Sequence, residues 1–293
     1  MEESSAAIQK FVSGDHSLTH HDWILKIATR DMLSSFTFCV AWQLFIVHSS
    51  VTATLRPLKF TKDYQHAKHL RREVFYSICT ILCGTFWEAV IMILYHTGYV
   101  NTWYMDWNKH QLWHAIMVIS MPIWRDGHFW WVHRMMHDWE TTTIPDIGAW
   151  LYKVAHSVHH TSRNIQPMSG ISMHPIEGLF YECSTLMPLM FTHHPIMTLL
   201  IKIDLNYAAI LGHDGHEYPA HGDWFHTIHH LKIKGNYGSA NAPFDWLFGT
   251  VDYGEDLDLD KQTEKFLQML EEQDRIEEEA DRNAGVKQRA KAK

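Results

Sequence analysis

Three histidine clusters lie between His133 and His230, and they constrain this chain more than any other feature. They are His133-Arg-Met-Met-His137, His156-Ser-Val-His159-His160 and His226-Thr-Ile-His229-His230. Residues three or four apart share one face of a helix, so His133 pairs with His137, and His156 can pair with His159 or with His160. Adjacent histidines diverge by roughly 100° around a helix. The second and third clusters can therefore each reach two metal ions.

Neutral imidazole is a ligand for Zn, Cu, Fe or Ni. The eight clustered imidazoles exceed the positions of one tetrahedral zinc ion. We therefore expect a two-metal site. A lone histidine is more often an ordinary surface or core residue, but three clusters of one pattern favour metal binding.

Composition limits the class of protein. The 293 residues are enough for one large domain. A formal net charge of -8 gives no overall basic surface for nucleic acid. The mean hydropathy of -0.22 disfavours a transporter with many spans. The four cysteines form no Cys-x-x-Cys pair, so we expect buried free thiols rather than disulfides.

Changes in composition predict four parts: a polar arm (1–31), spans with their loops (32–111), a catalytic domain (112–254) and a charged tail (255–293). Segments 32–55 and 74–95 are apolar and of a length that spans a bilayer as a helix. A buried soluble helix is the alternative for the first. The expected fold class is all-α: an integral membrane helical bundle with a cytosolic, histidine-rich helical cap holding the metals.

Two later segments place the clusters on one side of the membrane. Segment 112–132 is mostly apolar and leads into His133, whereas 178–211 is interrupted at Pro195. Each half of 178–211 is short for a span, so we expect a hairpin that enters and leaves on the same side. The basic loop 56–72 indicates a cytosolic position. From it we expect the histidine clusters and the tail to face the cytosol.

The order of motifs resembles the fatty acid hydroxylase / sterol desaturase superfamily of integral membrane di-iron enzymes. After the first two clusters come His174-Pro-Ile-Glu177 and His213-Asp-Gly, then the third cluster, Asn236-Tyr-Gly and Phe248-Gly-Thr. The His213 step and the third cluster are most similar to sterol C-5 desaturases. The loop after His213 departs from that pattern, which leaves the substrate open.

The resemblance implies an enzyme that uses O2 to desaturate or hydroxylate an unactivated C–H position of a lipid, most similar to those acting on sterols. It implies two iron ions, which zinc can replace in a purified protein. It also implies electrons from NAD(P)H through cytochrome b5 or an equivalent donor, and a multi-pass location in the endoplasmic reticulum membrane. Sequence alone does not separate hydroxylation from desaturation.

The expected ligands are the clustered histidines together with His213, which the resemblance adds. The full set is His133, His137, His156, His159, His160, His213, His226, His229 and His230, with His216 and His174 as weaker candidates. Around them we expect Asp126, Arg134, Glu177 and Asn236. Asp126 lies seven residues before His133 on the same helical face, so it is a candidate acceptor for a ligand's distal N–H.

Three other functions compete with a sterol oxidase. A fatty-acid or sphingolipid hydroxylase would use the same site. A membrane zinc-handling protein should carry its histidines within the spans, whereas here they follow the spans. A soluble two-metal hydrolase would be expected to mix carboxylates among its ligands, whereas these clusters contain histidine alone.

Overall fold

The computed structural model describes residues 20–48, 56–57, 67–97, 99, 107–162, 165–194, 196–217 and 223–258, with single positions up to 282. These residues are helical, apart from turns, loops and one short antiparallel pairing. In that pairing β1 (Arg56–Pro57) lies beside β2 (His216–Glu217), with Arg56 opposite Glu217. The expected helical class is confirmed for this part of the chain. The predicted tail falls mostly outside it.

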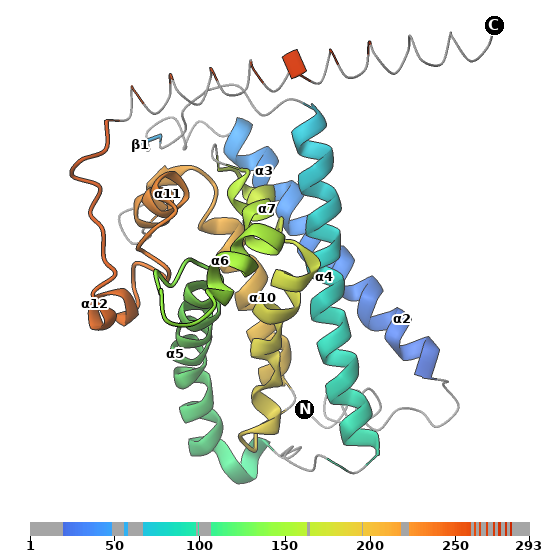
Figure 1. Ribbon diagram of the computed structural model, residues 1–293. Helices are drawn as coiled ribbons and strands as arrows, with labels where there is room; N and C mark the ends of the chain where they lie inside the picture. The colour runs from blue at the N-terminus through green and yellow to red at the C-terminus, as the bar shows by residue number, and fades with distance from the viewer. Residues whose placement is uncertain are drawn as a thin grey trace, which may run out of the picture.

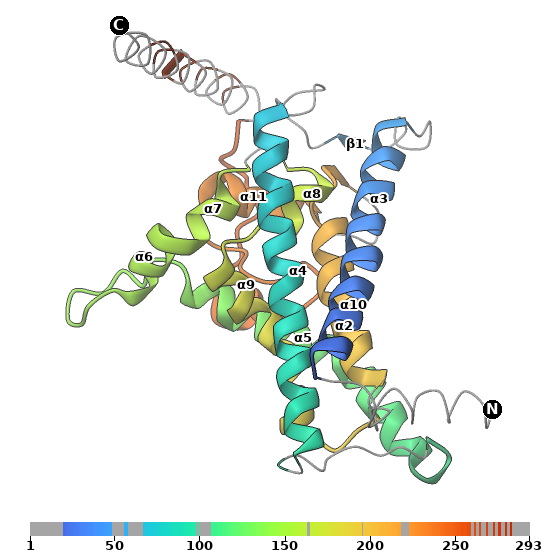
Figure 2. The ribbon, with the colours of Figure 1, turned by 90° about the vertical axis from the view of Figure 1, so that its right-hand side faces the viewer.

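The N-terminal helical run passes through the boundary expected at residue 31. Helix α2 (His20–Asp31), the π-helix η1 (Met32–Phe36) and α3 (Thr37–His48) follow one another without a break (Figure 2). Residues 49–55 of the predicted span lie outside the described residues. Asp31 is buried at the junction, where its carboxylate lies 2.5 Å from Nζ of Lys202. This ion pair connects the run to the later helix α10 (Ile196–Leu211).

Helix α4 (Ala67–His96) contains the predicted segment 74–95 and extends beyond it on both sides. Its stretch His69–Tyr95 is long and apolar enough to cross a membrane, the one helix of the described residues to meet that test. Helix α4 runs along most of the molecule and packs against α2 and α9 (Pro175–Glu182) (Figures 1 and 2).

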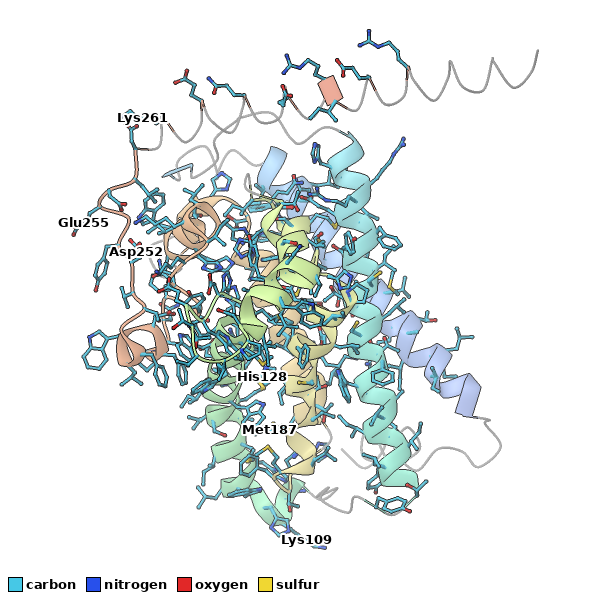
Figure 3. All side chains as sticks on the ribbon, viewed as in Figure 1. Lys109, His128, Met187, Asp252, Glu255 and Lys261 are labelled. Atoms are coloured by element: carbon cyan, nitrogen blue, oxygen red, sulfur yellow. The ribbon has the colours of Figure 1, made fainter. Side chains whose placement is uncertain are left out.

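Helix α5 (Gln111–Met135) carries the chain from one end of the molecule towards the histidine clusters. Lys109, in the 3-10 helix η3 (Trp107–His110) just before it, lies at that end, and His128 lies near the middle (Figure 3). Pro122 is tolerated inside α5. The helix continues into His133, as expected from segment 112–132.

The two halves of segment 178–211 run in opposite directions, as the arms of a hairpin do (Figure 1). Helix α9 (Pro175–Glu182) and the 3-10 helix η5 (Cys183–Leu189) lead away from the clusters, and α10 (Ile196–Leu211) returns (Figure 1). A core between these helices and α5 includes Met117, Tyr181 and Leu205. The hairpin therefore brings the second and third clusters to the same end of the bundle.

Short helices at that end form the histidine-rich part of the fold. The second cluster lies on the continuous run α6 (Ile147–Leu151), η4 (Tyr152–His156) and α7 (Ser157–His160), of which η4 is a π-helix. The third lies on α11 (Asp223–Lys232). Two further short helices, α8 (Pro167–Gly170) and α12 (Phe244–Phe248), pack around them against α10 and α5 respectively.

Candidate metal centre

The nine expected ligand histidines gather into two groups among the described residues. In each group, one ring nitrogen of every member lies within 4.8 Å of the others. The first group is His133, His137, His156, His160 and His229, and the second is His159, His213, His226 and His230. Within the first, Nε2 of His156 lies 2.9 Å from Nε2 of His133 and 3.0 Å from that of His160.

Helical periodicity explains how the clusters divide between the groups. The pairs four residues apart, His133/His137, His156/His160 and His226/His230, each stay within one group. His159 leaves the first group for the second, and His229 does the reverse. Adjacent positions on a helix diverge by roughly 100°, so His159 and His160 must face different groups. The sequence left open whether His156 pairs with His159 or with His160, and the structure groups it with His160.

Backbone carbonyl oxygens hold three of these imidazoles from behind. Nδ1 of His133 donates to the carbonyl oxygen of Tyr237 at 2.6 Å, and Nδ1 of His229 donates to that of Gly235 at 2.6 Å. Nδ1 of His213 donates to the carbonyl oxygen of Ala209 at 2.8 Å. A carbonyl oxygen can only accept, so the ring proton lies on Nδ1 and leaves Nε2 as an inward-facing lone pair.

Glu177 supplies a fourth support. Its Oε1 lies 2.7 Å from Nδ1 of His156, and both side chains are buried. Burial lowers the pKa of His156 and raises that of Glu177, because the interior penalises either charge. The sequence placed Glu177 beside the ligands, and this contact shows which ligand it orients.

The donor set fits metal ions. Nε2 of His213 lies 3.0 Å from Nε2 of His226 and 3.1 Å from that of His230. Burial lowers the pKa of His133 to about 4 and that of His159 to about 3, so these rings are neutral at physiological pH. Neutral rings with Nε2 lone pairs converging at this range repel one another unless a cation lies between them. All-imidazole sites suit Zn, Cu, Fe or Ni.

The two weaker candidates lie outside both groups. Nδ1 of His174 accepts the backbone N–H of Ile176 at 3.2 Å and so caps the start of α9. His216 lies in β2, where its Nδ1 is 3.2 Å from the carbonyl oxygen of Asp214. Helix α10 ends at Leu211, so the three-residue spacing of His213 and His216 does not place them on one helical face.

Asn236 fixes the loop that supplies two of the supporting carbonyls. It lies between Gly235 and Tyr237 at a φ of 52°. Its Nδ2 donates to the carbonyl oxygens of Phe225 and Asp252, and its Oδ1 accepts the N–H of Asp252. Asparagine tolerates this left-handed conformation better than most residues. Asn236 therefore acts on His133 and His229 through the backbone.

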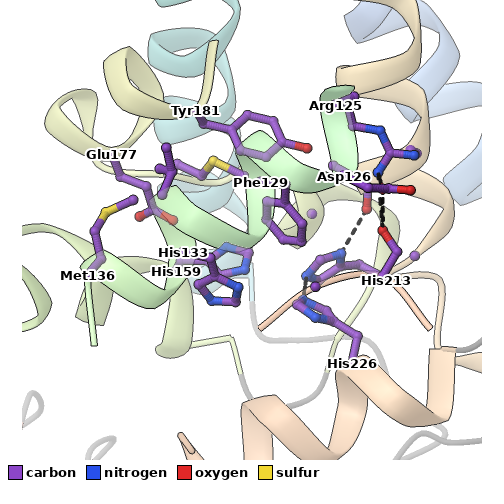
Figure 4. A pocket seen from close by; sticks show the side chains of 18 of the residues that line it. Arg125, Asp126, Phe129, His133, Met136, His159, Glu177, Tyr181, His213 and His226 are labelled. Carbon is purple, nitrogen blue, oxygen red and sulfur yellow. Dashed lines mark hydrogen bonds and ion pairs between the residues drawn. The ribbon is translucent and has the colours of Figure 1, made fainter. Parts of the chain in front are cut away.

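The other two expected surrounding residues lie at the edges of the centre. Arg134 donates to the carbonyl oxygen of Asp138 at 3.0 Å, and its guanidinium lies 5.2 Å from the centre of the Tyr237 ring. Asp126 contacts Arg125 and accepts a hydrogen bond from Ser239. Figure 4 places Asp126 on the side of His213 and His226.

Asp245 is a supporting residue that the spacing of histidines did not reveal. This buried carboxylate accepts the backbone N–H groups of Tyr237 and Gly238 and the indole N–H of Trp130. It thereby fixes the loop whose Tyr237 carbonyl holds His133. The sequence indicated Asp245 only through its place just before Phe248-Gly-Thr. No local rule predicts that this aspartate accepts a hydrogen bond from the backbone of Tyr237.

Two cavities meet the histidine groups from different sides. The surface of the first is mainly apolar, with side chains such as Phe129, Met136 and Met173, and this cavity reaches His133 and His213 (Figure 4). The second is lined mostly by polar and charged residues and reaches His137; its wall includes Arg134, Lys234, Glu140 and Asp252. The centre thus has an apolar approach and a polar approach.

The comparisons agree with the motif order. Residues 118–250 match the family model described as fatty acid hydroxylase. A Delta(7)-sterol-C5(6)-desaturase of Nicotiana tabacum is 27% identical over 50% of this chain and 52% of its own length. A Delta(7)-sterol 5(6)-desaturase of Candida glabrata is 25% identical over 72% of this chain and 58% of its own. A methylsterol monooxygenase 1 of Gallus gallus is 24% identical over 67% and 64%.

These alignments span somewhat more than half the length of the two desaturases. No solved structure gives a significant match to the chain. The family match covers all nine grouped histidines. Residues 118–250 thus match the fatty acid hydroxylase family model, and the chain is similar to proteins named sterol desaturase and methylsterol monooxygenase.

Proposed function

We propose that this protein is a membrane-bound oxidoreductase that uses two iron ions and O2 to desaturate or hydroxylate an unactivated C–H position of a lipid, most fittingly a sterol. The observation that carries the proposal is the pair of buried, neutral imidazole groups beside an apolar cavity. The relatives' names add that desaturation and mono-oxygenation of sterols both occur on related chains.

His133, His137, His156, His160 and His229 would hold one iron ion, and His159, His213, His226 and His230 the other. Bound iron would supply the redox chemistry with O2 that a polypeptide lacks. Hydrogen bonds from the surrounding chain orient the ligand rings. The carbonyl oxygens of Gly235 and Tyr237 accept from Nδ1 of His229 and His133, and Glu177 contacts Nδ1 of His156. Such outer contacts fix the ring orientation and raise ligand basicity.

The apolar cavity would position the lipid and exclude water. Phe129 lies in its wall and stacks on the His133 ring, with 5.1 Å between the ring centres. Tyr181 also lines the cavity. Its hydroxyl donates a hydrogen bond to the carbonyl oxygen of Leu205, so the ring contributes an apolar surface to the cavity wall. A dry, shaped wall protects reactive species from side reactions with water.

The proposal extends to location and electron supply. We place the protein in the endoplasmic reticulum membrane as a multi-pass protein, with the histidine groups facing the cytosol. Electrons would come from NAD(P)H through cytochrome b5 or an equivalent donor. Glycosylation acceptors test the orientation: one inserted near residue 105 should be modified, and one near residue 145 should not. Modification near residue 145 would overturn the orientation.

The function is tested by expressing the chain in a host and analysing its sterols, ceramides and fatty acids by mass spectrometry. The wild type should generate an oxidised lipid, and His133→Ala should not. His216→Ala, which removes a histidine outside both groups, is the matched control and should retain activity. Iron and zinc are measured on the purified proteins. Zinc with an unchanged lipid profile would favour a zinc-handling protein instead.

A further inference from the structure

A compact polar cluster lies in the wall of the otherwise mainly apolar cavity. Arg125, Asp126 and Ser239 all line it. Ser239 donates its hydroxyl proton to Oδ1 of Asp126 at 2.6 Å and accepts from Nη1 of Arg125 at 3.2 Å. The side chains of Arg125 and Asp126 are each 13% exposed. Polar groups this well buried are retained where they have partners to bind.

The charge of the cluster decides what it can bind. Arg125 is the single Lys or Arg among the described residues that line the cavity. Its guanidinium already forms ion pairs with two carboxylates. Its Nη1 lies 2.5 Å from Asp126 and its Nε 2.7 Å from Asp204. One guanidinium against two carboxylates leaves a net charge of about -1. A lipid carboxylate or phosphate would meet repulsion here, whereas a neutral hydroxyl can donate to the carboxylate and accept from its neighbours.

We propose that Arg125, Asp126 and Ser239 form a subsite for the hydroxyl group of a neutral lipid alcohol. The inference rests on the proposed function, because it takes the apolar cavity as the substrate site. Asp126 and His133 are seven residues apart on α5, which is about 10 Å along the helix. If the cluster holds a lipid by its hydroxyl, the carbon nearest the histidine groups would lie within about 10 Å of the hydroxyl oxygen. Asp126 and Ser239 are thus residues that determine specificity.

Binding to the purified full-length protein in detergent tests the subsite. The probes are cholesterol and its methyl ether, and 1-octadecanol, its methyl ether and stearate. Wild type should bind each alcohol about tenfold or more tightly than the matching ether, since a hydrogen bond to a charged group contributes that much. Stearate should bind more weakly than 1-octadecanol. No electron donor is added, so the assay measures binding alone. Hydroxyl recognition can therefore be confirmed or refuted whether or not the protein oxidises a lipid.

Two variants connect the preference to the cluster. Asp126→Asn and Ser239→Ala should each remove most of the preference for alcohol over ether. Ser120→Ala is the matched control, because Ser120 lies on the same helix and its hydroxyl donates to the carbonyl oxygen of Met117. Tryptophan fluorescence on heating checks that each variant is folded. Equal binding of alcohols and ethers, tighter binding of stearate, no binding of either alcohol, or an unchanged preference in folded Ser239→Ala would overturn the proposal.

Discussion

Nδ1 of His229 donates a 2.6 Å hydrogen bond to the carbonyl oxygen of Gly235, six residues further along the chain. The turn that allows this contact has a φ of 75° at Gly235, and the next residue, Asn236, donates its N–H to the carbonyl oxygen of Thr250 at 2.8 Å. A loop conformation open mainly to glycine therefore orients an imidazole of the first histidine group.

Gly235→Ala should disturb that group. A Cβ at this position would lie 2.8 Å from the carbonyl oxygen of Thr250, in addition to the strain of a positive φ. We expect the loop to shift and metal bound per chain to fall. Gly249→Ala is the control: its φ is 67° but nothing lies within 4 Å of the added Cβ. Elemental analysis measures both, and equal metal content in the two variants would contradict the expectation.

Single histidine substitutions should act on the two groups separately. His229→Ala removes a member of the first group and His159→Ala one of the second. We expect wild type to carry about two metal ions per chain and each variant about one, because the other group keeps its own donors. His174→Ala and His216→Ala, which lie outside both groups, should retain both ions. A full complement in His229→Ala and His159→Ala would count against the ligand assignment.

Glu177→Ala should weaken metal binding without removing a ligand. The carboxylate lies 2.7 Å from Nδ1 of His156, and loss of such an outer partner typically costs about 10–100-fold in affinity or activity. Glu177→Gln keeps an oxygen that can accept the ring N–H, so its loss should be smaller. Titration with a chelator gives the affinities. The proposed orienting role fails if Glu177→Ala binds metal as tightly as wild type.

The metal-free protein should become less stable as pH falls from about 6.5 to about 4. Burial lowers the pKa of His133 to about 4 and that of His159 to about 3. Between these values and the unfolded value near 6.5, the unfolded state binds more protons, so acid favours unfolding. For His133 alone, the lowered pKa corresponds to a loss of about 3 kcal/mol of stability as pH falls from neutral to about 4.

Thermal unfolding of the chelator-treated protein at pH 7.5 and pH 5 checks this sign. The melting temperature should be lower at pH 5. The raised pKa of Glu177 acts in the opposite sense, whereas the lowered pKa values of several buried histidines act together in the direction expected here. A melting temperature that stays constant or rises on acidification would show that the histidines are not buried as neutral rings.

The sequence predicted that the second and third clusters can each reach two metal ions, because adjacent positions on a helix diverge whatever surrounds the helix. The spacing left open whether His156 pairs with His159 or with His160, and the structure groups it with His160. The resemblance to the superfamily added His213, and the structure places it beside His226. Helical period does not relate His213 to His216, since α10 ends at Leu211 before either residue.

The extent of the helices was only partly predictable. The apolar segments 74–95 and 112–132 became α4 and α5, but both helices extend past the apolar residues. The boundary expected at residue 31 falls within a continuous helical run, because Asp31 is held there by Lys202. In the sequence, the charge of Asp31 indicates the end of an apolar segment. In the structure, its ion pair with Lys202, 171 residues away, allows Asp31 to lie inside the bundle.

The sequence by itself determined the chemistry of the centre: its imidazole donors, their helical spacing and the superfamily that they resemble. The tertiary structure alone decided how those donors are oriented, through the carbonyl oxygens of Gly235, Tyr237 and Ala209. It also decided that Asp245 holds the Tyr237 loop, and that Arg125, Asp126 and Ser239 meet in one cavity. The physical reason is that side-chain type and helical period are local, whereas every residue carries the same backbone carbonyl and only folding selects which one meets a ring.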